Sequence, residues 1–125
     1  SDADVAVHAL MDAMLGALGE GDIGRHFPDS DEQYRGIAST ELLRRVVELA
    51  RNKGYRVGNC DVTIVAQEPK LAPYIEEMRA NVARVLGVDV SRVNIKATTT
   101  ERLGFEGEGL GISAQAVAVM RSEAK

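Results

Sequence analysis

The sequence has few residues that would cross-link or stiffen it: its 125 residues include no tryptophan, one cysteine and three prolines. The single cysteine, Cys60, excludes an internal disulfide framework and is typical of a reducing compartment. No apolar run is long enough to span a bilayer. The net charge of −4 argues against a general binder of nucleic acid or of anionic membranes. We therefore expect neither nucleic acid nor a membrane as a partner.

The apolar residues that are present suffice for one folded domain. Hydrophobic residues make up 45% of the chain and charged residues 27%, and the length corresponds to a single domain. Apolar spacing predicts, in order, helices over Val5–Leu18 and Ser39–Asn52, a strand over Asn59–Gln67, a helix ending at Leu86, and strands over Val93–Thr98 and Ile112–Met120. Ser39 is expected to cap the second helix. This mixture of helices and strands indicates an α/β (α+β) fold.

The opening helix is unusual because its apolar residues surround the axis instead of forming one stripe. Such a helix is buried on most sides or covered by a partner chain. Asp4, His8 and Asp12 interrupt it at intervals of four residues and so lie along one face. His8 is then either a core histidine bonded to a carboxylate, which the helix alone favours, or a neutral imidazole available to a metal.

Three further segments carry polar groups that could form a site. Gly21–Gly24 and Phe27–Asp31 place carboxylates in turns shaped by glycine and proline, which indicates either a polar site or an ordinary solvated loop. Thr98–Glu101 combines three hydroxyls with a carboxylate before a glycine-rich stretch. Such a segment can hold phosphate oxygens and a divalent cation. Taken alone, it is better interpreted as a threonine-rich strand end before a hairpin.

Seven motifs occur along the chain in this order: SDADVAVHAL, GDIG, FPDSD, DVTIVAQEPKL, NIKATTTE, LGF and GISAQAVA. Together they resemble the 2-C-methyl-D-erythritol 2,4-cyclodiphosphate synthases over essentially the whole chain. The combination of NIKATTTE-x-LGF with SDADV-x-x-HAL and GDIG makes the resemblance specific, because no other family is expected to carry all three.

The resemblance implies a homotrimer of α/β subunits, each a single ferredoxin-like domain with a mixed sheet covered on one side by helices. It implies a phosphorus–oxygen lyase of the non-mevalonate isoprenoid pathway. The substrate would be 4-diphosphocytidyl-2-C-methyl-D-erythritol 2-phosphate, and the products the 2,4-cyclodiphosphate and CMP. The implied active site lies between neighbouring subunits, and the implied cofactors are a zinc ion and a second divalent cation, magnesium or manganese.

The resemblance also implies roles for residues of this chain. His8 resembles a zinc ligand, Glu101 the ligand of the second cation, and Thr99 the catalytic hydroxyl that steadies the transferred phosphate. The wall that receives the methylerythritol unit is expected to comprise Asp22, Ile23, Gly24, Phe27, Pro28, Asp29, Ser30 and Asp31. The cytidine and diphosphate sites are expected to comprise Ala66, Gln67, Glu68, Pro69, Lys70, Leu71, Ala72, Thr98, Thr99 and Thr100. Further substrate-binding residues are expected at Ser1, Glu101 and Phe105.

The chain departs from the family pattern in two places. The family's Asp-x-His zinc ligands and a catalytic histidine precede the position of Ser1, so we expect residues 1–125 to be a single catalytic domain that lacks this N-terminal strand segment. Glu108 stands where family members commonly have an arginine, within GFEGEGLG. In the family, that arginine meets the diphosphate of an isoprenoid on the trimer axis. A glutamate would repel this anion, so we do not expect an isoprenoid ligand here.

Two functions therefore stay open. The first is the enzyme, which is favoured because Asp22, Thr99 and Glu101 are retained. The second is a trimeric module that binds a nucleotide or diphosphate without turnover. The apolar first helix and the small face of the last strand, formed by Ala114, Ala116 and Ala118, are both consistent with a trimer. We expect a bacterial cytoplasmic protein, with the plastid stroma as the alternative location.

Overall fold

The computed structural model of the chain describes residues 2–66, 71–99, 104 and 111–123. Its strands form a three-stranded sheet in the order β2-β1-β3. The central strand β1 (Tyr55–Val65) is parallel to β2 (Val93–Thr98) and antiparallel to β3 (Ser113–Ser122). The predicted mixed sheet is therefore confirmed.

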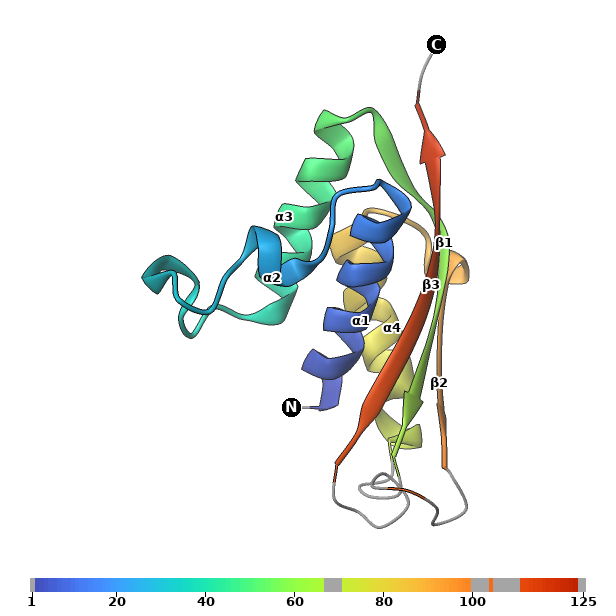
Figure 1. The fold of residues 1–125 in the computed structure, drawn as a ribbon. Coiled ribbons are helices and arrows are strands. Elements are labelled where there is room, and N and C mark those ends of the chain that lie inside the picture. The colour runs from blue at the N-terminus through green and yellow to red at the C-terminus, as the bar shows by residue number, and fades with distance from the viewer. Residues whose placement is uncertain (1, 67–70, 100–103, 105–110, 124–125) are drawn as a thin grey trace.

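Three helices form a layer on one side of this sheet: α1 (Asp2–Ala17), α3 (Ser39–Asn52) and α4 (Ile75–Leu86), as Figure 1 shows. The shorter elements are α2 (Ile23–His26) and the 3-10 turns η1 (Glu32–Tyr34), η2 (Ala72–Tyr74) and η3 (Val90–Arg92). Within the described ranges, no helix has both the length and the apolar character needed to cross a bilayer. The helix layer confirms the predicted arrangement, whereas the ferredoxin-like topology stays a prediction.

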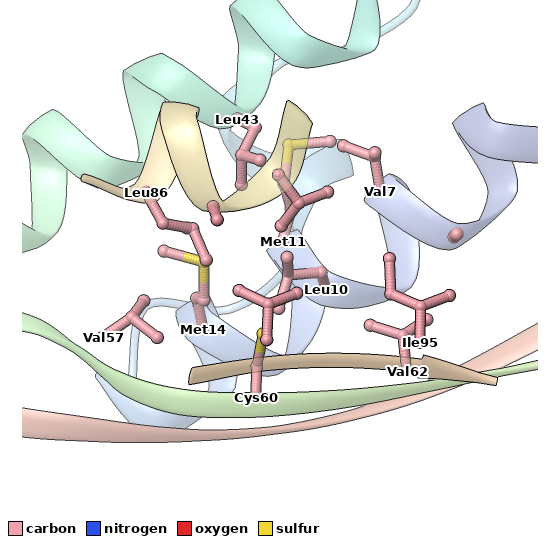
Figure 2. Packing of buried hydrophobic residues seen from close by; sticks show 14 of the residues in the cluster. Val7, Leu10, Met11, Met14, Leu43, Val57, Cys60, Val62, Leu86 and Ile95 are labelled. Carbon is pink, nitrogen blue, oxygen red and sulfur yellow. The ribbon is translucent and has the colours of Figure 1, made fainter. Parts of the chain in front are cut away.

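Helix α1 supplies the centre of the hydrophobic core. Its side chains Leu10, Met11, Met14 and Leu15 have no exposed surface. They belong to the buried cluster that α1 forms with α3, α4 and the sheet, in which Figure 2 labels Leu10, Met11 and Met14. The buried apolar side chains of this helix are therefore covered by elements of its own chain, and their number is not evidence for a partner subunit.

The central strand β1 alternates in the predicted way, with Cys60, Val62 and Ile64 facing the core. Burial raises the pKa of the Cys60 thiol to about 11, and the neighbouring charge of Asp61 acts in the same direction. At neutral pH the thiol is therefore protonated, and Cys60 serves as a packing residue rather than a nucleophile.

Strand β1 begins at Tyr55, earlier than the predicted start at Asn59. Its pairing with β3 shifts register between Val57 and Asn59, around Gly58. A Cβ atom at Gly58 would lie 2.8 Å from the Cγ and Cδ atoms of Arg121, so glycine leaves the space in which that side chain lies. The irregularity interrupts the alternation of polar and apolar residues, and the sequence pattern therefore predicted only the later part of the strand.

The predicted capping role of Ser39 is wrong. Ala38 occupies the capping position of α3 without a side-chain hydrogen bond, and Ser39 is the first helical residue. Ser39 is 8% exposed as a residue, and its hydroxyl instead donates a hydrogen bond to the carboxylate of Asp4 on α1. A charged acceptor forms a stronger bond than a neutral one, which accounts for this choice of partner. The bond joins the first turns of α1 and α3.

The alanine face of β3 is covered by α1 from the same chain, not by a second subunit. Ala116 and Ala118 pack against the core in half-buried positions. On the opposite face of this strand, Val117 is 69% exposed and Val119 is 49% exposed. The alternation along β3 thus leaves valines on the side of the sheet that none of the described helices covers (Figure 1).

Candidate functional site

His8 is exposed, although Val7 before it is buried in the core. The interpretation of His8 as a buried core histidine is therefore wrong. Asp12, one helical turn further on, is exposed as well. The face of α1 on which Asp4, His8 and Asp12 were predicted to lie points away from the sheet. The apolar side chains of α1 pack toward the sheet instead.

A glycine-rich turn brings the chain back alongside α1. Gly19 and Gly21 have φ values of 70° and 80°, in the left-handed region where side chains other than glycine are strained. The Asp22 carboxylate then caps α2, because its Oδ1 accepts a hydrogen bond from the Arg25 amide at 2.9 Å. The Oδ1 atom of Asp12 accepts a second bond at 2.8 Å, from the amide of Ile23.

This return path creates an open hollow of about 510 Å³, lined by His8, Ile23, Gly24, Phe27, Pro28 and Asp29. The structure therefore brings the predicted zinc ligand together with five residues of the predicted methylerythritol wall. Backbone amides, a carboxylate, an imidazole and an aromatic ring in one concave surface suit a small polar ligand. Asp22, Ser30 and Asp31 of the predicted wall are not part of this lining.

Packing around Phe27 supports the part of the hollow that this residue lines. Its ring meets the ring of Tyr34 edge to face, with centroids 5.2 Å apart. The guanidinium carbon of Arg45 lies 5.7 Å from the Tyr34 ring centroid, in cation–π geometry. Asp31 caps η1 and accepts hydrogen bonds from the side chain and backbone of Gln33, which together hold its carboxyl pKa below its usual value.

A second group of predicted site residues lies where β1 and β2 end. Because these strands are parallel, their carboxyl ends meet at one edge of the sheet, and Val65 pairs with Thr98. The Ala66 amide donates a hydrogen bond to the Thr98 carbonyl oxygen at 3.0 Å. Ala66 is buried, whereas Thr98 and Thr99 are exposed. Leu71 and Ala72 follow at the start of η2, and Leu71 is buried.

Several predicted site residues lie outside the described ranges: Ser1, Gln67, Glu68, Pro69, Lys70, Thr100, Glu101 and Phe105. The lining of the hollow contains none of the described residues at the strand ends. In Figure 1, α2 lies to the side of the helix layer, while β1 and β2 end at the bottom of the sheet. The described chain thus presents two separate groups of predicted site residues.

The donor set for a metal is incomplete in the part of the chain that the structure describes. That part holds no group of three or more histidine, cysteine, aspartate or glutamate side chains able to bind one ion. His8 offers an exposed imidazole, but the Asp12 carboxylate on the same face is bonded to the amide of Ile23. A catalytic zinc ion needs three protein ligands, so these residues supply one donor and not a zinc site.

Comparison with known proteins identifies the family. The model of the YgbB family matches residues 1–121. The 2-C-methyl-D-erythritol 2,4-cyclodiphosphate synthase of Syntrophotalea carbinolica is 63% identical over 124 residues, which are 99% of this chain and 76% of that protein. The synthase of Geobacillus kaustophilus is 62% identical over 121 residues, 97% of this chain and 77% of that protein. This chain belongs to the 2-C-methyl-D-erythritol 2,4-cyclodiphosphate synthase family.

Solved structures agree with this assignment. The bifunctional IspDF protein of Campylobacter jejuni matches 94% of this chain with a TM-score of 0.90 and 40% identity, and the matched part is 32% of that longer chain. The CDP complex of IspF from Plasmodium falciparum matches 96% of this chain and 72% of its own, with a TM-score of 0.83 and 32% identity. The family resemblance is confirmed, and with it the predicted enzyme, a lyase of the non-mevalonate isoprenoid pathway.

Sequence reasoning missed two contributors to the site. Asp12 was assigned only to a possible metal face, because nothing in the spacing showed that α2 would return to it. The glycines at 19 and 21 are the signal that a tight return was available. Tyr34 was not singled out, and its contact with Phe27 depends on tertiary packing that no local pattern carries.

Proposed function

We propose that this chain converts 4-diphosphocytidyl-2-C-methyl-D-erythritol 2-phosphate into 2-C-methyl-D-erythritol 2,4-cyclodiphosphate and CMP. Family membership supports the reaction. The observation that carries the proposal is that His8 and Ile23, Gly24 and Asp29 line the same hollow. This is the juxtaposition that the reaction needs, because the methylerythritol unit has to lie beside the phosphates that react.

In this reaction an oxygen of the 2-phosphate attacks the β-phosphorus. A new phosphorus–oxygen bond forms, the bond from the β-phosphorus to the bridging oxygen breaks, and CMP leaves with that electron pair. Several negative charges approach one another, so fixed donors and cations have to offset their repulsion. We assign Thr99 to the transferred phosphate. Its exposed position just after β2 is compatible with this role.

The metals belong to this proposal. His8 would contribute one zinc ligand, and the other ligands would have to come from outside the described residues. Bound zinc would offset phosphate charge and orient the attacking group. Glu101 would hold the second cation, magnesium or manganese. The contribution that follows from the described residues alone is the shape of the hollow and the position of the methylerythritol unit in it.

We further propose that the chain works as a homotrimer with its site shared between subunits. The two groups of site residues are separate within one chain, so a neighbouring subunit can complete each site by setting its strand ends against the hollow. The exposed Val117 and Val119 supply an apolar surface for assembly. The complexes of relatives with CDP support a cytidine nucleotide as ligand. The two curated relatives above are bacterial, which supports the bacterial cytoplasm as the location.

The competing proposal is a trimer that binds the nucleotide without turnover. The incomplete donor set among the described residues is the observation in its favour. Release of CMP from the authentic substrate, measured with zinc and magnesium present and followed by chromatography, separates the two. Sustained release supports the enzyme. CDP binding by calorimetry with no CMP release would overturn it and leave the binding module.

A further inference from the structure

One carboxylate links the helix that carries His8 to the turn that faces it. Asp12 follows His8 by four residues, one helical turn, on α1. Its Oδ1 atom accepts the hydrogen bond of the Ile23 amide at 2.8 Å. Ile23 begins α2, and the amides of a first helical turn have no acceptor within their own helix. Asp12 thus satisfies from another helix a donor that the cap residue leaves unpaired.

Two carboxylates accept hydrogen bonds from backbone amides at the start of α2. Asp22 accepts the amide of Arg25 and closes the turn onto itself. Asp12 accepts the amide of Ile23 and fixes the turn to α1. Of these two bonds, only the second joins the turn to the helix that carries His8. The glycines at 19 and 21 supply the positive φ values of the return, and the Glu20 amide between them donates a hydrogen bond to the Leu15 carbonyl oxygen at 2.8 Å, ahead of the turn that faces His8.

The bond between Asp12 and the Ile23 amide fixes residues that line the hollow. Ile23 and Gly24 line it opposite the helix, together with His8. The Ile23 side chain also packs against the core, which gives the turn a second anchor. The anchor on the core limits large movements, whereas a directional bond of 2.8 Å limits the rotation and small shifts of the backbone. A misplacement of about 1 Å can cost a large share of a reaction rate.

We propose that Asp12 is a positioning residue for the cyclisation: its carboxylate holds the Asp22–Gly24 turn at a fixed place across the hollow from His8. This inference rests on the proposed function and adds to it. Asp12 acts through the backbone of Ile23 and does not touch the reacting phosphates. The role needs an acceptor oxygen at this place, not a negative charge, so an asparagine side chain can supply it.

The test compares Asp12→Ala and Asp12→Asn in the full chain supplied with zinc and magnesium. Loss of one hydrogen bond to a charged group predicts a fall in kcat/KM of roughly tenfold for Asp12→Ala. Asp12→Asn should recover most of it. The zinc content should match that of the unaltered protein in both variants, because Asp12 is not assigned as a ligand. CDP affinity should also stay unchanged, since the strand ends are a separate group.

Asp89→Ala is the matched control. Asp89 is exposed and accepts a backbone amide, that of Ser91, at 2.9 Å, but it caps η3 and is not part of the hollow. It should leave kcat/KM unchanged. The Ile23 amide should exchange its hydrogen faster in Asp12→Ala, a readout that does not depend on turnover.

Three outcomes overturn the inference in distinguishable ways. No turnover in the unaltered protein would remove the proposed function and the positioning role with it. Normal turnover with an unchanged kcat/KM in Asp12→Ala would remove only the positioning role. A low kcat/KM in both Asp12 variants, accompanied by loss of zinc, would make Asp12 a metal ligand instead.

Discussion

The amide of Ala66, one residue past the last paired residue of β1, donates a hydrogen bond of 3.0 Å to the carbonyl oxygen of Thr98, the last paired residue of β2. This bond keeps the two strand ends together at one edge of the sheet. Backbone groups at such an edge can recognise the edge of a pyrimidine. We therefore expect CDP to bind at least about tenfold more tightly than ADP, the ratio that one or two additional hydrogen bonds provide. Calorimetry measures both affinities, and equal binding of CDP and ADP would contradict the cytidine site.

The bond between Ser39 and Asp4 predicts a stability effect. Ser39→Ala leaves a carboxylate without its hydroxyl donor at a nearly buried position, so the free energy of unfolding should fall by about 1–3 kcal/mol. Thr40→Ala, at the next and exposed residue of the same helix, is the control and should change it by less than about 0.5 kcal/mol. Urea titration of both variants checks this. Equal stability of the two variants would show that the Ser39 hydroxyl contributes nothing.

Asp61, on the sheet face opposite the helices, is expected to make the stability of the protein depend on pH. Lys96 first and Asn94 second donate hydrogen bonds to its carboxylate and lower its pKa below the usual value. A lowered folded-state pKa stabilises the protein above the unfolded-state pKa, and this contribution is lost as the pH falls through the folded-state pKa. Lys96→Met should therefore raise the Asp61 pKa, and Asn94→Leu should raise it less. NMR titration of the Asp61 carboxyl carbon measures both, and an unchanged pKa in Lys96→Met would rule the contact out.

The exposed valines of β3 predict how assembly can be broken. Val117 pairs with Asp61 across the ladder, so Val117→Asp sets two carboxylates side by side on this face. We expect this variant to sediment as a monomer at micromolar concentration, while the unaltered protein sediments as a trimer. Gln115→Glu, on the same face of the same strand, is the control and should stay trimeric. A trimeric Val117→Asp variant would place the interface elsewhere.

The particular residues show which parts of this protein a sequence pattern predicts. Helix α3 and strand β2 have the predicted bounds, because their apolar periodicity is regular. The early part of β1 was missed because Gly58 interrupts the alternation. The exposure of His8 could not be read from α1, since apolar neighbours on all sides made burial the simpler interpretation. Which side of a helix stays uncovered depends on tertiary packing. The sheet and α3 cover other sides of α1 and leave the side of His8 exposed.

The resemblance predicted more of the site than periodicity did. It assigned His8 to the zinc and Ile23, Gly24, Phe27, Pro28 and Asp29 to the methylerythritol wall of one active site, and these residues line one hollow. It also grouped Ala66 with Thr98, which share a hydrogen bond. Contacts through backbone atoms, such as the amide of Ile23 on Asp12, were beyond both approaches because any residue except proline has that amide.

The role of His8 is the central claim, and the chain's other histidine, His26, provides a matched control. His8 lines the hollow, whereas His26 is not part of the lining and its Nε2 atom lies 2.6 Å from the backbone oxygen of Glu20. The most direct measurement is zinc content together with CMP release from the authentic substrate, for His8→Asn and His26→Asn beside the unaltered protein. His8→Asn should lose most of its zinc and at least about a hundredfold in turnover, because a three-ligand site does not tolerate the loss of one ligand. His26→Asn should keep both. A His8→Asn protein that retained its zinc and its CMP release would contradict the assignment of this hollow as the active site.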